Sequence, residues 1–97
     1  MLLHMCSSDE WNASADHEDY KLDGFAREGF IHCCLERQLS GVLKRYFQNK
    51  NDLLLLFIEQ EKLNSSINYE SGADQDMFPH VYGPINKTAI IKVEKLR

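Results

Sequence analysis

The chain has 97 residues, which is enough for one domain with a single hydrophobic core, and no Gly/Ser-rich or Pro-rich stretch divides it. Its 15 Asp and Glu residues outnumber its 11 Lys and Arg residues, and the net charge of -4 argues against a surface built for phosphate contacts with DNA. We therefore expect one compact domain over residues 1–97 that does not bind DNA.

The cysteine content and the start of the chain indicate the compartment. Three cysteines are an odd number, and the apolar start at residues 1–3 is interrupted at once by His4, so no signal peptide is predicted. The longest apolar run, residues 53–58, is far shorter than the roughly 20 residues of a membrane-spanning helix. We expect a cytoplasmic protein with free thiols and no membrane contact.

A strand over residues 2–6 is expected to lead into a short helix. Ser7 is placed to cap this helix, and Glu10 three residues later completes a capping box. The helix is predicted from about Ser8 to Ala15, with Trp11 and the terminal alanine facing inward because they lie four residues apart. An irregular connection is expected over residues 20–25.

The stretch at residues 29–34 reads Gly-Phe-Ile-His-Cys-Cys and predicts a buried strand, which places His32 where titratable side chains are scarce. An amphipathic helix is predicted next, over about residues 36–48. Its apolar positions recur at spacings of three and four: Leu35, Leu39, Val42, Leu43, Tyr46 and Phe47.

The second half of the chain predicts mainly strands. Residues 53–58 are continuously apolar and should form an interior strand that is buried on both faces. Residues 67–70 alternate like a short edge strand, residues 71–76 form an acidic loop, residues 78–84 form a rigid turn, and residues 89–94 form the last strand. The predicted fold class is α+β, with two main helices on a curved mixed or antiparallel sheet.

Three histidines occur in apolar surroundings, and each is either a core histidine that bonds a backbone carbonyl or a member of a shared cleft. Pockets combine apolar walls with a few converging polar groups. We predict that one cleft is lined by His4, Trp11, His32, Glu70, His80 and Tyr82. Glu70 is a candidate general base or ribose-binding carboxylate, or else a solvated residue on a strand edge.

A metal site and a cysteine nucleophile are the alternatives near the central run. On a strand His32 and Cys34 share a face but Cys33 does not, and neither C-x-x-C nor H-x-x-x-H spacing occurs. We therefore expect no metal. A nucleophilic pair of Cys34 and His32 would need a lowered thiol pKa, so structural burial of both thiols is favoured.

Several phrases in this sequence resemble the domain-of-unknown-function 952 family, in order and spacing over nearly the whole chain. They are Gly-Phe-Ile-His-Cys at 29–33, the apolar run 53–58 followed by Glu59, Tyr69-Glu70, and Phe-Pro-His-Val-Tyr-Gly-Pro at 78–84. The resemblance implies a fold like that of ADP-ribosyltransferases, with a split, strongly curved sheet whose cleft holds NAD in the true enzymes.

In this resemblance His4 is similar to the first-strand histidine of those enzymes, and His32 is similar to a second histidine of the related RNA 2′-phosphotransferases. No Gly-Thr follows His4 and no Glu-x-Glu motif occurs, so the resemblance does not carry catalysis with it.

Together these observations predict a domain with a histidine-lined cleft for a nucleotide-like or phosphorylated small molecule, with NAD or another nucleotide as the candidate cofactor. His32, His4 and Glu70 are the candidate catalytic residues. Trp11, His80 and Tyr82 are the candidate ligand-binding residues, and His32 is expected to matter most. The alternative is a non-catalytic binding or structural domain with buried structural histidines. The sequence decides neither whether the protein is an enzyme nor its oligomeric state.

Overall fold

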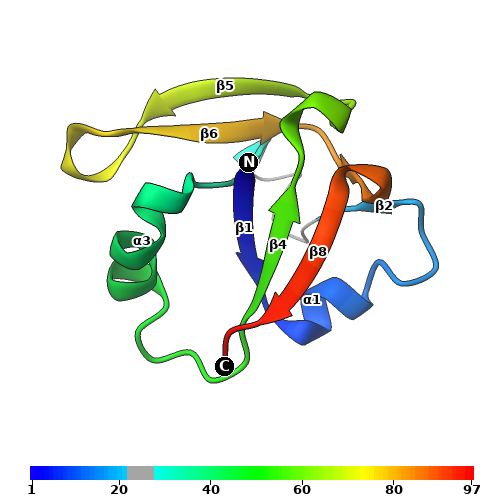
Figure 1. The fold of residues 1–97 in the computed structure, drawn as a ribbon, viewed down its shortest axis with the longest axis horizontal. Helices are drawn as coiled ribbons and strands as arrows, with labels where there is room; N and C mark the ends of the chain where they lie inside the picture. Colours follow the sequence, from blue (N-terminus) through cyan, green and yellow to red (C-terminus); the bar gives the residue numbers. More distant parts are fainter. Residues whose placement is uncertain (22–27) are drawn as a thin grey trace.

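The computed structural model describes residues 1–21 and 28–97, so the expected connection at residues 20–25 lies mostly outside the described part. Its first sheet has the strand order β1-β4-β8, with every pairing antiparallel. The strands are β1 (Leu2–Cys6), β4 (Leu54–Ile58) and β8 (Ile90–Lys95). Figure 1 shows β4 between its two neighbours, so the predicted interior position of residues 53–58 is confirmed.

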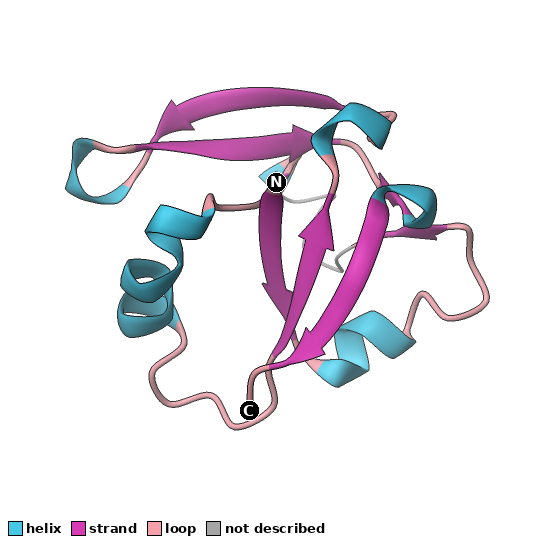
Figure 2. Cartoon of the chain, in the orientation of Figure 1, coloured by secondary structure: helices cyan, strands magenta, loops and turns pink. Residues whose placement is uncertain are grey.

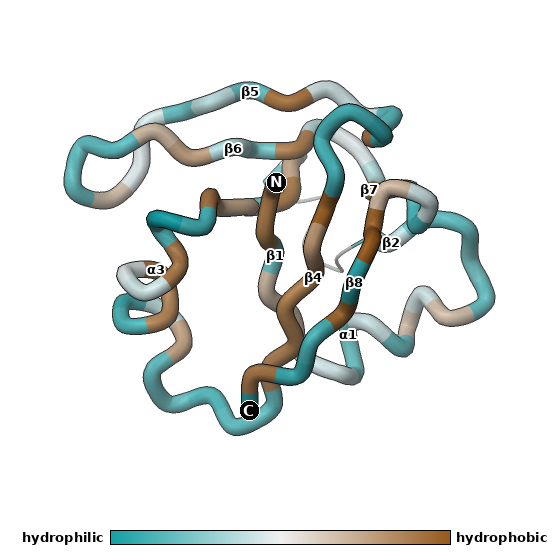
Figure 3. Tube along the Cα trace, in the orientation of Figure 1, coloured by the Kyte–Doolittle hydropathy of each residue, from teal (hydrophilic) through white to brown (hydrophobic). Residues whose placement is uncertain are grey.

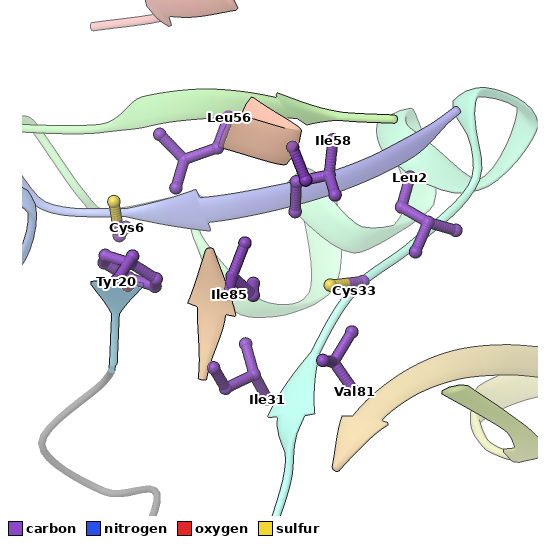
Figure 4. Close-up of a cluster of buried hydrophobic side chains, with 10 residues drawn as sticks. Leu2, Cys6, Tyr20, Ile31, Cys33, Leu56, Ile58, Val81 and Ile85 are labelled. Atoms are coloured by element: carbon purple, nitrogen blue, oxygen red, sulfur yellow. The ribbon is translucent and has the colours of Figure 1, made fainter. Parts of the chain in front are cut away.

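Strands β1 and β4 separate two hydrophobic clusters because successive side chains of a strand point to opposite faces. On β4, Leu56 and Ile58 belong to one cluster, and Leu55 belongs to the other. Figure 4 shows the first cluster, in which Leu56, Ile58 and Leu2 face Ile85 and other buried side chains. Most of β1 and β4 is brown in Figure 3, and this colour marks the hydrophobic residues that burial on two faces requires.

A second antiparallel sheet has the order β3-β6-β5, and a two-stranded pair joins β2 to β7. The strands are β3 (Ile31–His32), β6 (Met77–Tyr82), β5 (Ser66–Ser71), β2 (Asp19–Tyr20) and β7 (Ile85–Asn86). The prediction of an edge strand over residues 67–70 is confirmed by β5. The prediction of a rigid turn over residues 78–84 is wrong, because most of that stretch forms the central strand of this sheet.

Proline is unusual in a central strand because it cannot donate a backbone hydrogen bond. The carbonyl of Pro79 accepts a hydrogen bond from Cys33 N at 3.1 Å, and an antiparallel pair would normally return a second bond from the opposite amide. Because Pro79 has no N–H, that second bond cannot form, and β3 ends at His32.

The prediction that His32 is buried is wrong. In the short strand β3, Ile31 points into the core and the side chain of His32 points to the opposite face, where 61% of it is exposed. The alternation of strand side chains explains both observations.

The two predicted helices are present and shorter than expected. Helix α1 (Ser8–Asn12) begins with the predicted capping box, in which Glu10 N donates to Ser7 Oγ and Ser7 N donates to Glu10 Oε1. Ala15 lies beyond this helix and is exposed, whereas Ser14 is buried.

The second helix consists of a 3-10 turn η1 (Glu36–Gln38) that continues into α3 (Leu39–Tyr46). Tyr46 was expected to face inward but is exposed. Figure 2 shows the helical segments at the margins of the strands, including the short turns η2 (Gln60–Lys62), η3 (Ala73–Gln75) and η4 (Lys87–Ala89). The described residues thus form a compact α+β domain, and none of their helices is long and apolar enough to cross a membrane.

Candidate functional site

A cavity of about 510 Å³ lies among strand β1, helix α3 and the end of the β5–β6 hairpin. Most of its wall is apolar and comes from the second hydrophobic cluster: Leu3, Met5, Val42, Phe47, Leu53 and Phe78. A space of this size with such walls suits a small organic ligand.

Three histidines contribute to the wall of this cavity: His4, His32 and His80. His32 and His80 are directly opposite each other on β3 and β6, and their ring centroids are 5.0 Å apart. The tertiary structure therefore brings together two histidines that are 48 positions apart in the chain.

The ring of His80 is held by a carboxylate. Its Nδ1 lies 2.6 Å from Glu70 Oε1, and the hydroxyl of Tyr82 donates to the same oxygen at 2.5 Å. The hydrogen bond from Tyr82 is the largest influence on the Glu70 carboxyl, and together with the smaller effect of the bond from His80 it lowers the pKa of Glu70. The hydrogen bond between Tyr82 and Glu70 also raises the pKa of Tyr82. Glu70 is therefore an ionised acceptor near neutral pH, and Nδ1 of His80 is the donor.

The other ring nitrogen of His80, Nε2, has no hydrogen-bond partner among the described residues, 1–21 and 28–97. When the neutral ring carries its proton on Nδ1, Nε2 is a hydrogen-bond acceptor. The side chain of His80 is only 11% exposed. The site therefore presents a fixed imidazole with a free acceptor nitrogen.

Phe30 packs directly against this imidazole. Its ring stacks on His80 with a centroid distance of 4.2 Å and an angle of 13°, and it meets His32 edge-on at 4.8 Å. Gly29, with φ of +85°, gives the backbone a left-handed turn immediately before Phe30. Sequence reasoning missed Phe30 because it assigned the whole run to a buried strand, although the glycine before it was a usable signal.

His32 makes a more exposed hydrogen bond to a carboxylate. Its Nε2 lies 2.9 Å from Glu28 Oε2, and both side chains are largely accessible to solvent. We use the name histidine cluster for the connected group of Phe30, His32, Glu70, His80 and Tyr82.

His4 plays the part that the sequence reasoning considered for His32. Its Nδ1 donates to the carbonyl of His32 at 2.6 Å, and its Nε2 accepts from the hydroxyl of Tyr20 at 3.0 Å. Burial lowers the pKa of His4, so the ring is neutral and both nitrogens are engaged. His4 thus ties β1 to β3 and supports the backbone of His32.

Trp11 lies outside the lining of the cavity. Its ring packs near Tyr20, at a centroid distance of 5.9 Å, and beneath the ammonium group of Lys87. Of the six residues predicted to line one cleft, the three histidines His4, His32 and His80 line the cavity. Glu70 and Tyr82 belong to the histidine cluster but do not line the cavity, and Trp11 is separated from both.

The cysteine thiols are poor nucleophiles in this structure. All three are buried and free, and burial raises the pKa of Cys6 and of Cys34 to about 11 and raises that of Cys33 as well. A thiol needs a lowered pKa to react at neutral pH, so the geometry gives no support to a pair of Cys34 and His32. Among the described residues, no group of three or more His, Cys, Asp or Glu side chains could hold a metal ion.

The cavity is polar at another part of its wall, around the start of α1. Glu10 and Asp52 contribute there together with Ser7 and Lys50. One oxygen of each carboxylate is used locally, since Ser7 N donates to Glu10 and Ser8 N donates to Asp52. The second oxygen of each carboxylate makes no hydrogen bond within the described part of the chain.

The fold and the site define a small antiparallel α+β domain with an apolar cavity beside a histidine cluster. A family model described as a protein of unknown function, DUF952, matches residues 5–93, and the chain belongs to this family.

The crystal structure of protein CC0527 from Caulobacter crescentus is similar over 99% of this chain and 85% of that chain, with a TM-score of 0.88 and 24% identity. The solution NMR structure of CC0527 is similar over 98% of this chain and 83% of that chain, with a TM-score of 0.81 and 24% identity. At this identity the likeness shows a shared fold. No curated protein matches the chain.

Proposed function

We propose that this domain binds a small molecule whose apolar portion occupies the cavity and whose polar group contacts Nε2 of His80. One observation carries the proposal: a carboxylate and a stacked phenyl ring fix the imidazole, and its free nitrogen belongs to a residue in the wall of a largely apolar cavity. Binding sites typically combine such apolar walls with a few placed polar groups.

The pair of Glu70 and His80 also supports acid–base chemistry in principle. The carboxylate accepts from Nδ1 and selects the tautomer in which Nε2 can take a proton from a ligand. Tyr82 holds the carboxylate in place, and His32 adds a second imidazole 5.0 Å away. In this proposal His80, which the sequence analysis assigned only to ligand binding, takes the central role instead of His32.

The wall chemistry favours a nucleotide-like or phosphorylated ligand in one orientation. The planar base would pack against apolar side chains such as Phe78, and hydroxyl or amino donors would face the free carboxylate oxygens of Glu10 and Asp52. A ribose hydroxyl would then lie near Nε2 of His80 and donate a hydrogen bond to it. NAD is included in this class, and an NAD-related transfer would place Glu70 near the developing positive charge.

The proposal extends to fold family and compartment. The split arrangement of small antiparallel sheets and the sequence resemblance support an ADP-ribosyltransferase-like fold. Three buried thiols without a disulfide suit a reducing cytoplasm.

The test is an NMR titration of the ¹⁵N-labelled protein with NAD, ADP-ribose and AMP, read at the histidine side chains. We expect saturable shifts at His80, and a loss of affinity of about tenfold or more in His80→Gln. His17→Gln is the matched control, since His17 is exposed and outside the cavity. Absence of saturable shifts with all three nucleotides would defeat the nucleotide proposal, and equal affinity of His80→Gln would defeat the role of His80.

A structural role is the second candidate, and for His4 a specific observation favours it. Both nitrogens of His4 are engaged inside the protein. Thermal melts separate the two roles. A structural histidine lowers the melting temperature when replaced, whereas a ligand-binding histidine lowers affinity and leaves the melt nearly unchanged.

A further inference from the structure

Strand β8 forms an edge of the β1-β4-β8 sheet (Figure 1). Leu96 N donates to Leu53 O, so in the alternating pattern of an antiparallel pair the backbone groups of Glu94 and Lys92 also point toward β4. The N–H and C=O groups of Val93 and Lys95 therefore point away from β4. Among the described residues, no strand pairs with this side of β8.

The side chains of β8 differ between its two faces. Val93 is 40% exposed on the face of its partner Leu56, and Ile91 nearby is 50% exposed. Lys92 and Glu94 lie on the other face, 3.2 Å apart, and the ammonium group of Lys92 lies over the ring of Phe57. The edge thus combines apolar groups with one positive and one negative charge two positions apart.

We propose that a second copy of this chain pairs with β8, antiparallel and centred on Val93. A two-fold axis at that position places Lys92 opposite Glu94 of the partner subunit and Glu94 opposite Lys92 of the partner subunit. Val93, whose backbone groups point outward, meets its own copy as a hydrogen-bonded pair. Opposite charges in directly opposed positions stabilise an antiparallel pair.

The charges select this register over its neighbours. Centring the axis on Lys92 or on Glu94 would place like charges directly opposite each other, which is destabilising. If the register of the two β8 strands shifted by one residue, the side chains on one face of this chain's sheet would lie beside those on the opposite face of the partner's sheet. The same charges also discriminate against unrelated strands, since lysines on an exposed edge normally deter pairing.

The pairing would join two three-stranded sheets into one six-stranded sheet, with β8 and its copy at the centre. None of the residues that line the cavity lies in β8. The dimer is therefore independent of the proposed ligand site, and a negative result for one proposal does not contradict the other.

Sedimentation equilibrium of the full 97-residue chain tests the dimer from micromolar to millimolar concentration. We expect the weight-average mass to rise from the monomer value of 11.3 kDa toward twice that value. Lys92→Glu and Glu94→Lys each place like charges across the axis, and each should weaken dimerisation by about tenfold or more.

Mixing the two variants is the decisive arm. In the mixed pair, every position opposite a glutamate is a lysine. Lys92→Glu and Glu94→Lys should therefore associate with each other more tightly than either variant associates with itself. Lys44→Glu, an exposed charge reversal on α3, is the matched control and should dimerise like the wild type. Thermal melts confirm that each variant is folded. A wild type that is monomeric at every concentration, a dimer indifferent to both reversals, or folded variants that fail to associate on mixing would each overturn the proposal.

Discussion

The internal role of His4 makes a quantitative prediction about pH. Burial is the largest influence on its ring and lowers its pKa below the ordinary value of 6.5. In the unfolded chain the same ring titrates near 6.5, so between that value and the lower folded pKa the unfolded state binds more protons. The buried neutral ring of His4 therefore contributes its full stabilisation of the folded state above pH 6.5. This contribution is lost as the pH falls from 6.5 toward the lower pKa of His4 in the folded protein.

The size of the effect follows from linkage. One proton bound only by the unfolded state costs about 1.4 kcal/mol of folding free energy for each pH unit below 6.5, until the folded pKa is reached. His4→Gln removes this slope. It also destabilises the protein at neutral pH by about 1–3 kcal/mol, because the carbonyl of His32 or the hydroxyl of Tyr20 loses its partner.

The assay is urea unfolding at pH 7.5, 6.5 and 5.5 for the wild type, His4→Gln and the control His17→Gln. Between pH 6.5 and 5.5, the free energy of unfolding should fall by the same amount in the wild type and in His17→Gln. In His4→Gln it should fall by less, because the contribution of His4 is absent. Parallel pH profiles for the wild type and His4→Gln would refute the reasoning, because the buried neutral ring would then make no difference to proton uptake on unfolding.

Three further changes probe the core and the cavity. Leu56→Ala removes a fully buried side chain from the central strand and should cost about 2–5 kcal/mol in urea unfolding, whereas a cost below 1 kcal/mol would contradict the packing described here. Gly72→Ala places a Cβ 2.6 Å from the ring of Phe78, so it should destabilise the fold by about 1–3 kcal/mol and alter the NMR signals of the cavity; an unchanged spectrum would rule out this contact. The thiol of Cys34, with a pKa of about 11, should react with iodoacetamide at pH 7.5 about 100-fold more slowly in the folded protein than in urea, and equal rates would show that its burial is overstated.

Local sequence patterns determined the elements that depend on residues close together in the chain. The continuous apolar run at residues 53–58 predicted an interior strand, and β4 occupies that position between β1 and β8. The Ser7 and Glu10 capping box needs only residues three apart, and it forms as predicted. The capping box is readable because only neighbouring residues make it, and the apolar run is readable because a strand that is covered on both faces needs an apolar side chain at nearly every position.

The tertiary structure decided which histidine is buried and which is available. His4, His32 and His80 have similar local surroundings, but the antiparallel pairing turns His32 outward and places its carbonyl against His4. Strand face depends on register with a distant partner, and a shift of one residue exchanges the faces. No local pattern could therefore assign the structural role to His4.

Long-range pairing also created the histidine cluster. Residues 78–84 carry Pro and Gly-Pro signals that favour a turn, and only pairing with β3 and β5 on both sides makes β6 a central strand. That pairing places Glu70 beside His80 and brings Phe30 onto the imidazole from a segment 50 residues away. Local patterns determined the strands β1, β4, β5 and β8 and the kinds of side chain available. The fixed imidazole beside an apolar cavity exists only because the sheets hold distant segments together.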